Sequence, residues 1–128
     1  MAKTAFLFPG QGSQYVGMGA DLYEADPAAR ELFEVAEDVT GLPLKRLCFE
    51  GPMQELTLTV NLQPAVTVVN LCLHQALAQA GVEEVRGGHD CTFSDARRFY
   101  SFRRDRVTGR HAALIWIDSE GSRMQARV

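Results

Sequence analysis

The stretch FLFPGQGSQYVGMG, residues 6–19, sets a short apolar run before a proline and then places four glycines and two glutamines within ten residues. Residues 4–8 are β-branched and aromatic enough to predict a short buried strand. Pro9 ends that strand, because proline cannot donate to a β-ladder. Gly10 and Gly12 then allow the backbone to turn tightly and to come close to a ligand. The stretch therefore predicts a strand-to-helix turn that faces a bound molecule.

Two helices are expected after this turn. Asp26 and Pro27 suit the N-cap and first position of the first helix, in which apolar residues recur at helical spacing up to Gly41. Asn61 is expected to cap the second helix, which is apolar nearly all round and therefore belongs in the middle of a domain. Residues 82–85 have the composition of a second strand. These elements together predict an α/β layer fold.

Composition and cysteine usage exclude several classes of protein. A chain of 128 residues with 46% apolar and 23% charged residues is typical of a soluble globular domain. The apolar run before Pro9 lacks a signal-peptide cleavage site, and residues 64–73 are too few to span a bilayer, so a cytoplasmic protein is expected. Cys48, Cys72 and Cys91 lack the C-x-x-C spacing of a metal pair, so we expect reduced, mostly buried thiols and no metal site.

The net charge of −3 is unevenly distributed. Residues 1–85 carry 4 basic and 11 acidic side chains, a net of −7, whereas residues 86–128 carry 9 arginines and 5 acids, a net of +4. The chain therefore changes character near Arg86. We predict a boundary here, with an ordered part over residues 1–87 and a divergent, arginine-rich tail over residues 88–128 that is not native-like.

The glycine-rich turn fits neither of the common phosphate-binding loops. Tyr15 stands where a dinucleotide fingerprint needs its third glycine, and Met18 stands where a phosphate-binding loop needs lysine. A turn that presents the neutral amide of Gln11 as a hydrogen-bond donor remains. Such a donor suits the oxyanion of acyl transfer, where one donor contributes about 3 to 4 kcal/mol to the transition state. A plain tight turn with exposed glutamines is the alternative.

The amino-acid sequence of the turn gives a more specific indication. FPGQGSQYVGMG strongly resembles the N-terminal signature of the malonyl-CoA:acyl-carrier-protein transacylases and of related acyltransferase domains of fatty-acid and polyketide synthases. The resemblance continues through Gly51-Pro52, Glu55-Leu56 and Gln63-Pro64-Ala65 to about residue 81. It implies an α/β-hydrolase-like core with a parallel sheet, of which residues 1–87 would be the N-terminal, incomplete part of the large subdomain.

The resemblance also implies a reaction. Members of the family transfer a malonyl group from malonyl-CoA to the phosphopantetheine thiol of acyl carrier protein, through an ester on a serine that a distant histidine activates. The coenzyme A thioester and acyl carrier protein would be the partners, with no cofactor, membrane, nucleic acid or oligomer expected. By resemblance Gln11 lies on the oxyanion-hole side of the site, and Gly10, Gly12 and Gln63 contact substrate. A helix-start glutamine that bonds its own backbone is an equal alternative for Gln63.

The chain departs from the family pattern at the nucleophile. Gly88-His89-Asp90-Cys91-Thr92 stands where the family has G-H-S-x-G, so the glycine and His89 match, but Asp90 replaces the serine and Thr92 the closing glycine. Attack by Asp90 on a thioester would give a mixed anhydride, and Cys91 lies one place late for the pocket. We therefore expect no transacylase activity from this chain. For His89, packing beside the turn is favoured over a catalytic role.

Beyond Asp90 almost no family likeness is visible. Arg123 is only a faint echo of the arginine that would bind the malonyl carboxylate, and His111 has no recognisable context. Ser94 and Asp95 form no recognisable triad. His74, on the apolar helix, is expected to be a core or boundary residue.

Two interpretations of the tail stay open. An abrupt change to arginine inside a motif is what a shifted reading frame in a GC-rich gene would produce. Alternatively, residues 97–104, RRFYSFRR, interleave aromatic rings with cations as nucleic-acid- or anion-binding modules do. An unstructured charged tail is the alternative to such a binding module, and a nucleic-acid partner is not expected.

Overall fold

The computed structural model describes residues 6–82, 94–98, 101–107, 114–117 and 124–127. The chain divides into two compact units, of which one is Phe6–Glu84 and the other comprises Met1–Ala5 and Val85–Val128. The first unit is built from helices. They are α1 (Ala20–Ala25), α2 (Pro27–Thr40), α3 (Leu44–Phe49), α4 (Met53–Leu56) and α5 (Thr59–Gln79).

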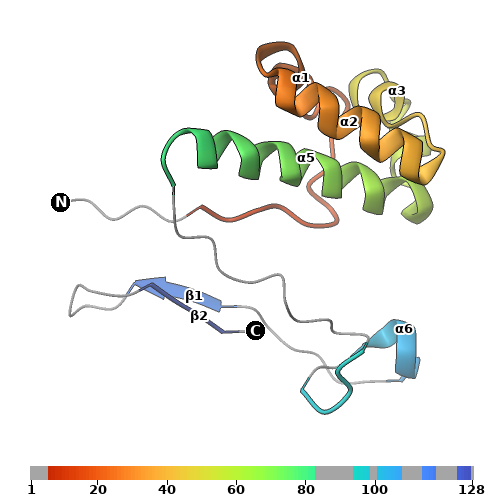
Figure 1. The fold of residues 1–128 in the computed structure, drawn as a ribbon. Coiled ribbons are helices and arrows are strands. Elements are labelled where there is room, and N and C mark those ends of the chain that lie inside the picture. Colours follow the sequence, from red (N-terminus) through yellow and green to blue (C-terminus); the bar gives the residue numbers. More distant parts are fainter. Residues whose placement is uncertain (1–5, 83–93, 99–100, 108–113, 118–123, 128) are drawn as a thin grey trace. The chain divides into compact units, whose positions relative to one another are not determined.

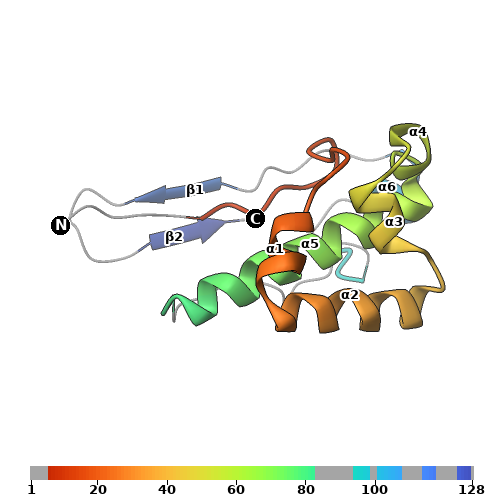
Figure 2. The same ribbon diagram turned by 90° about the horizontal axis from the view of Figure 1, so that it is seen from above.

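Helix α5 is the centre of the first unit, because it contacts each of the other four helices. Figure 1 shows α1, α2 and α3 on one side of α5, with the extended segment that begins at residue 6 on the other side. Figure 2 shows α2 running beside α5 with α1 crossing nearby. The segment that carries the glycine-rich turn is thus laid against a helix.

Helix α2 follows the local signals in the sequence. The Asp26 carboxylate accepts a hydrogen bond from the Ala28 amide at 2.9 Å, Pro27 occupies the first turn, and Gly41 ends the helix with φ at 68°. Asp26 therefore satisfies one of the amides that a helix start leaves without a partner. The predicted bounds of this helix are confirmed.

The core of the first unit lies between α2, α3 and α5. Its largest fully buried side chains are Phe33, Leu44, Leu47, Leu56, Leu62, Val68, Cys48 and Cys72. Burial raises the pKa of the Cys48 thiol to about 12 and that of Cys72 to about 11, because the thiolate loses its hydration there. Both are free thiols, as expected, whereas Cys91 lies outside the described residues.

Helix α5 differs from the prediction in its start and its surroundings. It begins at Thr59 after Leu58, so Asn61 lies inside the helix and does not cap it, and the Asn61 Nδ2 donates to the Glu55 carbonyl at 2.9 Å. Only one face of the helix is buried in the part of the chain that the structure describes. Val60 is 68% and Leu71 48% exposed, so α5 is central, as its apolar character predicts, but residues 6–82 leave part of its apolar surface uncovered.

The strand predicted over residues 4–8 is not formed at residues 6–8. Phe6, Leu7 and Phe8 have no regular secondary structure and are 51%, 72% and 41% exposed. A strand needs a neighbour for its amides and carbonyls, and residues 6–82 contain no other strand. Val82 is likewise outside any strand, and Thr4, Ala5 and residues 83–85 lie outside the described residues. The predicted parallel sheet is therefore not seen within residues 6–82.

The second unit contains regular elements of its own. Helix α6 is Phe102–Asp105, and strands β1 (Leu114–Ile117) and β2 (Met124–Arg127) pair antiparallel, with Ile115 opposite Ala126. The described part of the tail is therefore not structureless, in contrast to the unstructured charged tail considered above.

Candidate functional site

The glycine-rich turn spans Gly10 to Ser13. The Ser13 amide donates to the Gly10 carbonyl at 3.2 Å, and Gly12 has φ at 102°, a conformation that glycine adopts without strain. The Gly12 amide donates to the Gln14 side-chain oxygen at 2.9 Å. A Cβ atom added at Gly10 or Gly12 would meet nothing within 4 Å, so open space adjoins the turn on the side of both glycines. A ligand can approach the backbone there.

The other two glycines contact the core, Gly19 by close packing and Gly17 by a backbone hydrogen bond. Gly19 has φ at 78°, and a Cβ atom there would lie 3.0 Å from a methyl of Val69. The Gly17 amide donates to the Cys48 carbonyl at 2.7 Å. Helix α1 begins only at Ala20, so the turn at Gly12 does not lead directly into a helix as predicted. The reason is that residues 16–19 form a second turn, which anchors the chain to the core.

Gln11 and Gln63 are brought together although 52 residues separate them. The Gln63 Nε2 donates to the Gln11 Oε1 at 3.0 Å. Gln11 is exposed and Gln63 is half-buried on α5. The alternative that Gln63 bonds its own backbone is wrong, since its side-chain amide bonds Gln11. Because this contact uses the oxygen of Gln11, it leaves the Nε2 donor of Gln11 for another acceptor.

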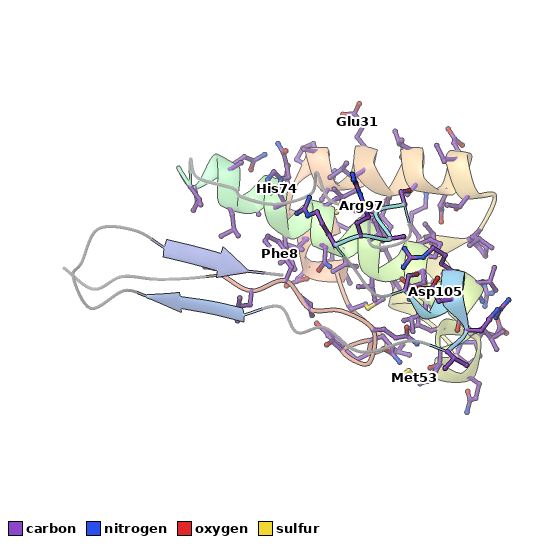
Figure 3. All side chains as sticks on the ribbon, turned by 90° about the horizontal axis from the view of Figure 1, so that it is seen from below. Phe8, Glu31, Met53, His74, Arg97 and Asp105 are labelled. Carbon is purple, nitrogen blue, oxygen red and sulfur yellow. The ribbon has the colours of Figure 1, made fainter. Side chains whose placement is uncertain are left out.

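Two further residues of α5 hold the same segment, and sequence reasoning missed them. The Asn70 Nδ2 donates to the Pro9 carbonyl at 2.8 Å, and the rings of Phe8 and His74 lie 6.5 Å apart, tilted by 42° (Figure 3). Gln63, Asn70 and His74 are spaced by seven and four residues, which places them on one stripe of the helix. The signal was a polar Asn70 within an apolar helix, and it could suggest a partner but not which one.

A cavity of about 150 Å³ adjoins the turn. Five apolar side chains line it, together with Pro9, Gly19 and four polar residues. The apolar side chains are Met18, Leu22, Val66, Val69 and Leu73, and the polar residues are Ser13, Tyr15, Asp21 and Asn70. Pro9 and Ser13 belong to the glycine-rich segment, so one wall of the cavity is the segment itself.

The resemblance described above also includes Gly51-Pro52 and Glu55, and these residues shape the fold between α3 and α4. The Arg46 guanidinium donates to the Gly51 carbonyl at 3.0 Å and to the Glu55 carboxylate at 2.7 Å, which ties α3 to α4. Gly51 has φ at 78°, and a Cβ atom there would lie 2.9 Å from a methyl of Val16. Gly51 therefore acts through its backbone conformation, and Glu55 acts through the bond of its side chain to Arg46.

The motif that has Asp90 at the position of the nucleophilic serine lies outside the described residues. His89, Asp90 and Cys91 lie outside the described residues, as do His111 and Arg123. Among the described residues, no group of three or more His, Cys, Asp or Glu side chains is arranged to hold a metal ion. None of the helices described here is long and apolar enough to cross a membrane.

The arginine-rich segment places carboxylates beside its cations. Arg98 lies 3.6 Å from the Asp95 carboxylate, and Arg104 lies 2.7 Å from that of Asp105 on α6, which is labelled in Figure 3. The hydrogen bond raises the pKa of Arg104 and lowers the pKa of Asp105, because each charge stabilises the other. Two of the positive charges that would face a phosphate backbone are thus balanced locally.

Comparison with known proteins identifies close relatives of the first unit. Residues 5–88 match the model of the acyl transferase domain. The malonyl CoA-acyl carrier protein transacylase of Bacillus subtilis is 46% identical over 90 residues, 70% of this chain and 28% of that protein. The Escherichia coli protein of the same name is 34% identical over 139 aligned residues, 92% of this chain and 45% of that protein. The chain thus spans less than half the length of these two relatives.

Solved structures agree with this match. The acyl-carrier-protein S-malonyltransferase of Bartonella henselae superposes with a TM-score of 0.56 at 45% identity, over 59% of this chain and 24% of that one. A malonyl-transacylase in complex with its type II polyketide synthase acyl-carrier protein superposes with a TM-score of 0.56 at 39% identity, over 60% and 25% of the two chains.

The match to the Escherichia coli protein corrects one expectation. An alignment over 92% of a 128-residue chain must extend well past Asp90, so family likeness does not end there. The 139 aligned positions exceed the length of this chain, so the alignment also contains gaps. Motif inspection alone missed this similarity.

Proposed function

Since the chain belongs to the acyl transferase domain family, we propose that it is the N-terminal part of a malonyl-CoA:acyl-carrier-protein transacylase. The whole protein would transfer malonyl groups from malonyl-CoA to acyl carrier protein in fatty-acid or polyketide biosynthesis. The observation that carries this proposal is the hydrogen bond between Gln11 and Gln63 beside an open glycine turn. The matched complex of a transacylase with its acyl-carrier protein supports the choice of partner.

In this proposal Gln11 stabilises charge. A nucleophilic oxygen attacks the thioester carbon, the carbonyl oxygen becomes an oxyanion, and the carbon–sulfur bond then breaks to release the thiol of coenzyme A. The Nε2 donor of Gln11 is suited to face that oxyanion, because a preset neutral donor need not reorganise, and the open space beside Gly10 and Gly12 lets a substrate approach it. The acyl group then passes to the phosphopantetheine thiol. The transfer is redox-neutral, so the reaction needs no redox cofactor.

The same proposal covers the fold and the domain boundary. Residues 1–87 would belong to the large subdomain of an α/β-hydrolase-like core with a parallel sheet, and residues 88–128 would be the divergent tail. The exposed, apolar residues 6–8 support this, since they have the character of a strand without its sheet. A cytoplasmic location stays a prediction.

The chain itself is proposed to be inactive, because Asp90 stands at the position of the nucleophilic serine. The test is to incubate the chain with malonyl-CoA and to measure its intact mass, with the Bacillus subtilis relative treated in parallel. We expect the relative to gain a malonyl group and this chain to gain none. A malonyl group mapped to Asp90 or Cys91 would show that a substitute nucleophile acts.

The origin of the tail is tested at the level of the gene. The coding DNA from about codon 80 onward should be resequenced and translated in all three frames. A second frame that reads G-H-S-x-G and continues as a long transacylase would assign the activity to the restored protein. Closed or unrelated alternative frames would make the tail genuine and leave an inactive relative of the family.

A further inference from the structure

We propose that Asn70 is a positioning residue that sets the place of Gln11. Its side chain holds the Pro9 carbonyl, and thereby keeps the Gln11 side chain within reach of Gln63. What Gln11 does for the reaction rests on the proposed function. The positioning itself rests only on contacts within residues 6–82.

The hydrogen bond between Asn70 and Pro9 can run in one direction only. The Pro9 carbonyl can only accept a hydrogen bond, so the Nδ2 of Asn70 must face it, at 2.8 Å. Gly10 alone separates Pro9 from Gln11, so fixing this carbonyl restricts where Gln11 begins. The ring of His74 against Phe8 holds the segment on the other side of Pro9. Gln11 is therefore presented from an anchored backbone.

The surroundings of Asn70 oppose a purely structural role. Its Oδ1 is buried and has no hydrogen-bond partner among the described residues. A buried acceptor without a donor lowers stability, and asparagine is also a poorer helix former than leucine. Asn70 lines the cavity beside Val66, Val69 and Leu73, where a leucine would find room and apolar neighbours. Stability would favour an apolar residue here, whereas the bond to Pro9 requires an amide.

The test separates stability from positioning with the variant Asn70→Leu in the full chain. Amide hydrogen exchange is followed at Gly12 and Ser13 in the turn and at core positions of α5, by mass spectrometry of short peptides or by NMR. We expect exchange in the turn to become about 5- to 10-fold faster, the factor for one net hydrogen bond, while exchange in the α5 core stays equal or slows. If Asn70 had only a structural role, its replacement would accelerate exchange both in the turn and in the α5 core.

Two more variants complete the design. Asn61→Leu, on the same helix as Asn70, removes a matched bond from Nδ2 to the Glu55 carbonyl of α4, and should leave exchange in the turn unchanged. Gln11→Ala gives the NMR position of the Gln63 side-chain amide without its partner. In Asn70→Leu the Gln63 resonance should move toward that position.

The proposal is overturned if the turn exchanges equally in the wild type and in Asn70→Leu, or if the Gln63 resonance stays in place. If Asn70→Leu does not fold, Asn70→Ala removes the same bond with a strong helix former, and the same outcomes apply. None of these readouts uses malonyl-CoA. A failure of the proposed function therefore remains distinguishable from a failure of this inference.

Discussion

At the scale of single residues, the glycines of the opening stretch serve two purposes. Gly10 and Gly12 face open space, whereas Gly19 is enclosed by the core near Val69 and Phe33. The sequence could show that glycines were needed, since turns and close approaches both favour them. It could not show which glycine serves which purpose, because the neighbours of Gly19 come from helices α2 and α5.

The packing role of Gly19 can be measured with Gly19→Ala. Its φ of 78° makes a side chain unfavourable by about 1 to 2 kcal/mol, and the overlap with Val69 adds about 1 kcal/mol or more. Gly41→Ala is the matched control, because φ there is 68° and no atom lies within 4 Å of the added Cβ. Urea unfolding should show the larger loss for Gly19→Ala. Equal losses would mean that the core yields at no cost.

The buried thiols predict a dependence of stability on pH. The pKa of Cys48 is raised to about 12 and that of Cys72 to about 11, both above the value of about 8.5 expected in the unfolded chain. The unfolded state therefore releases these protons first, so their contribution is complete below about pH 8.5 and is lost as pH rises toward the folded values. Between pH 8 and 10 the free energy of unfolding should fall by about 2 kcal/mol per thiol.

Urea unfolding of the wild type and of the double variant Cys48→Ala/Cys72→Ala at both pH values checks this dependence. The double variant starts from a lower stability because it leaves cavities, but it should lose less between the two pH values. An identical loss in both proteins would assign the pH dependence to other groups.

At the scale of elements, prediction succeeded where the signal was local. Asp26, Pro27 and Gly41 mark α2 by their own chemistry, and the structure has the helix within those bounds. The start of α5 was missed because the helix begins after Leu58, whose side chain cannot cap it. Asn61, the residue with the chemistry of a cap, lies inside the helix and donates to the Glu55 carbonyl. A strand at residues 6–8 was wrong for a related reason, since a strand depends on neighbours that residues 6–82 do not supply.

The cap of α2 should contribute measurably to stability. Asp26→Ala removes the acceptor for the Ala28 amide, and we expect the free energy of unfolding to fall by about 1 kcal/mol. Asp38→Ala is a suitable control, because this exposed aspartate lies near the end of α2, where negative charge is unfavourable. Urea unfolding should rank Asp38→Ala at or above the wild type and Asp26→Ala below it.

At the scale of the whole molecule, the two units differ in how far sequence could describe them. Family resemblance placed Gln11 and Gln63 at one site but did not predict the hydrogen bond between them, and the residues alone showed only two polar side chains far apart in the chain. Asn70 and His74 were out of reach, because 61 residues separate Asn70 from its partner Pro9 and no local rule joins them. In the tail, the predicted boundary near Arg86 rests on the change of charge and stays a prediction.

The charge of the tail leads to a prediction about nucleic acid. Arg98 and Arg104 each lie beside a carboxylate, so residues 97–104 offer fewer uncompensated charges than their sequence indicates. We expect no saturable binding of single-stranded RNA to the full chain at low salt, measured by fluorescence anisotropy. Binding that weakens steeply as ionic strength rises would contradict this, since phosphate contacts release counterions.

The stripe on α5 has a consequence for when the site takes shape during synthesis. The three contacts that hold residues 8–11 reach Gln63, Asn70 and His74, so all of the partners lie within residues 8–74. The codons of these partners are therefore translated before those of the tail. The position of Gln11 is thus encoded early in the message, upstream of whatever reading frame follows codon 88.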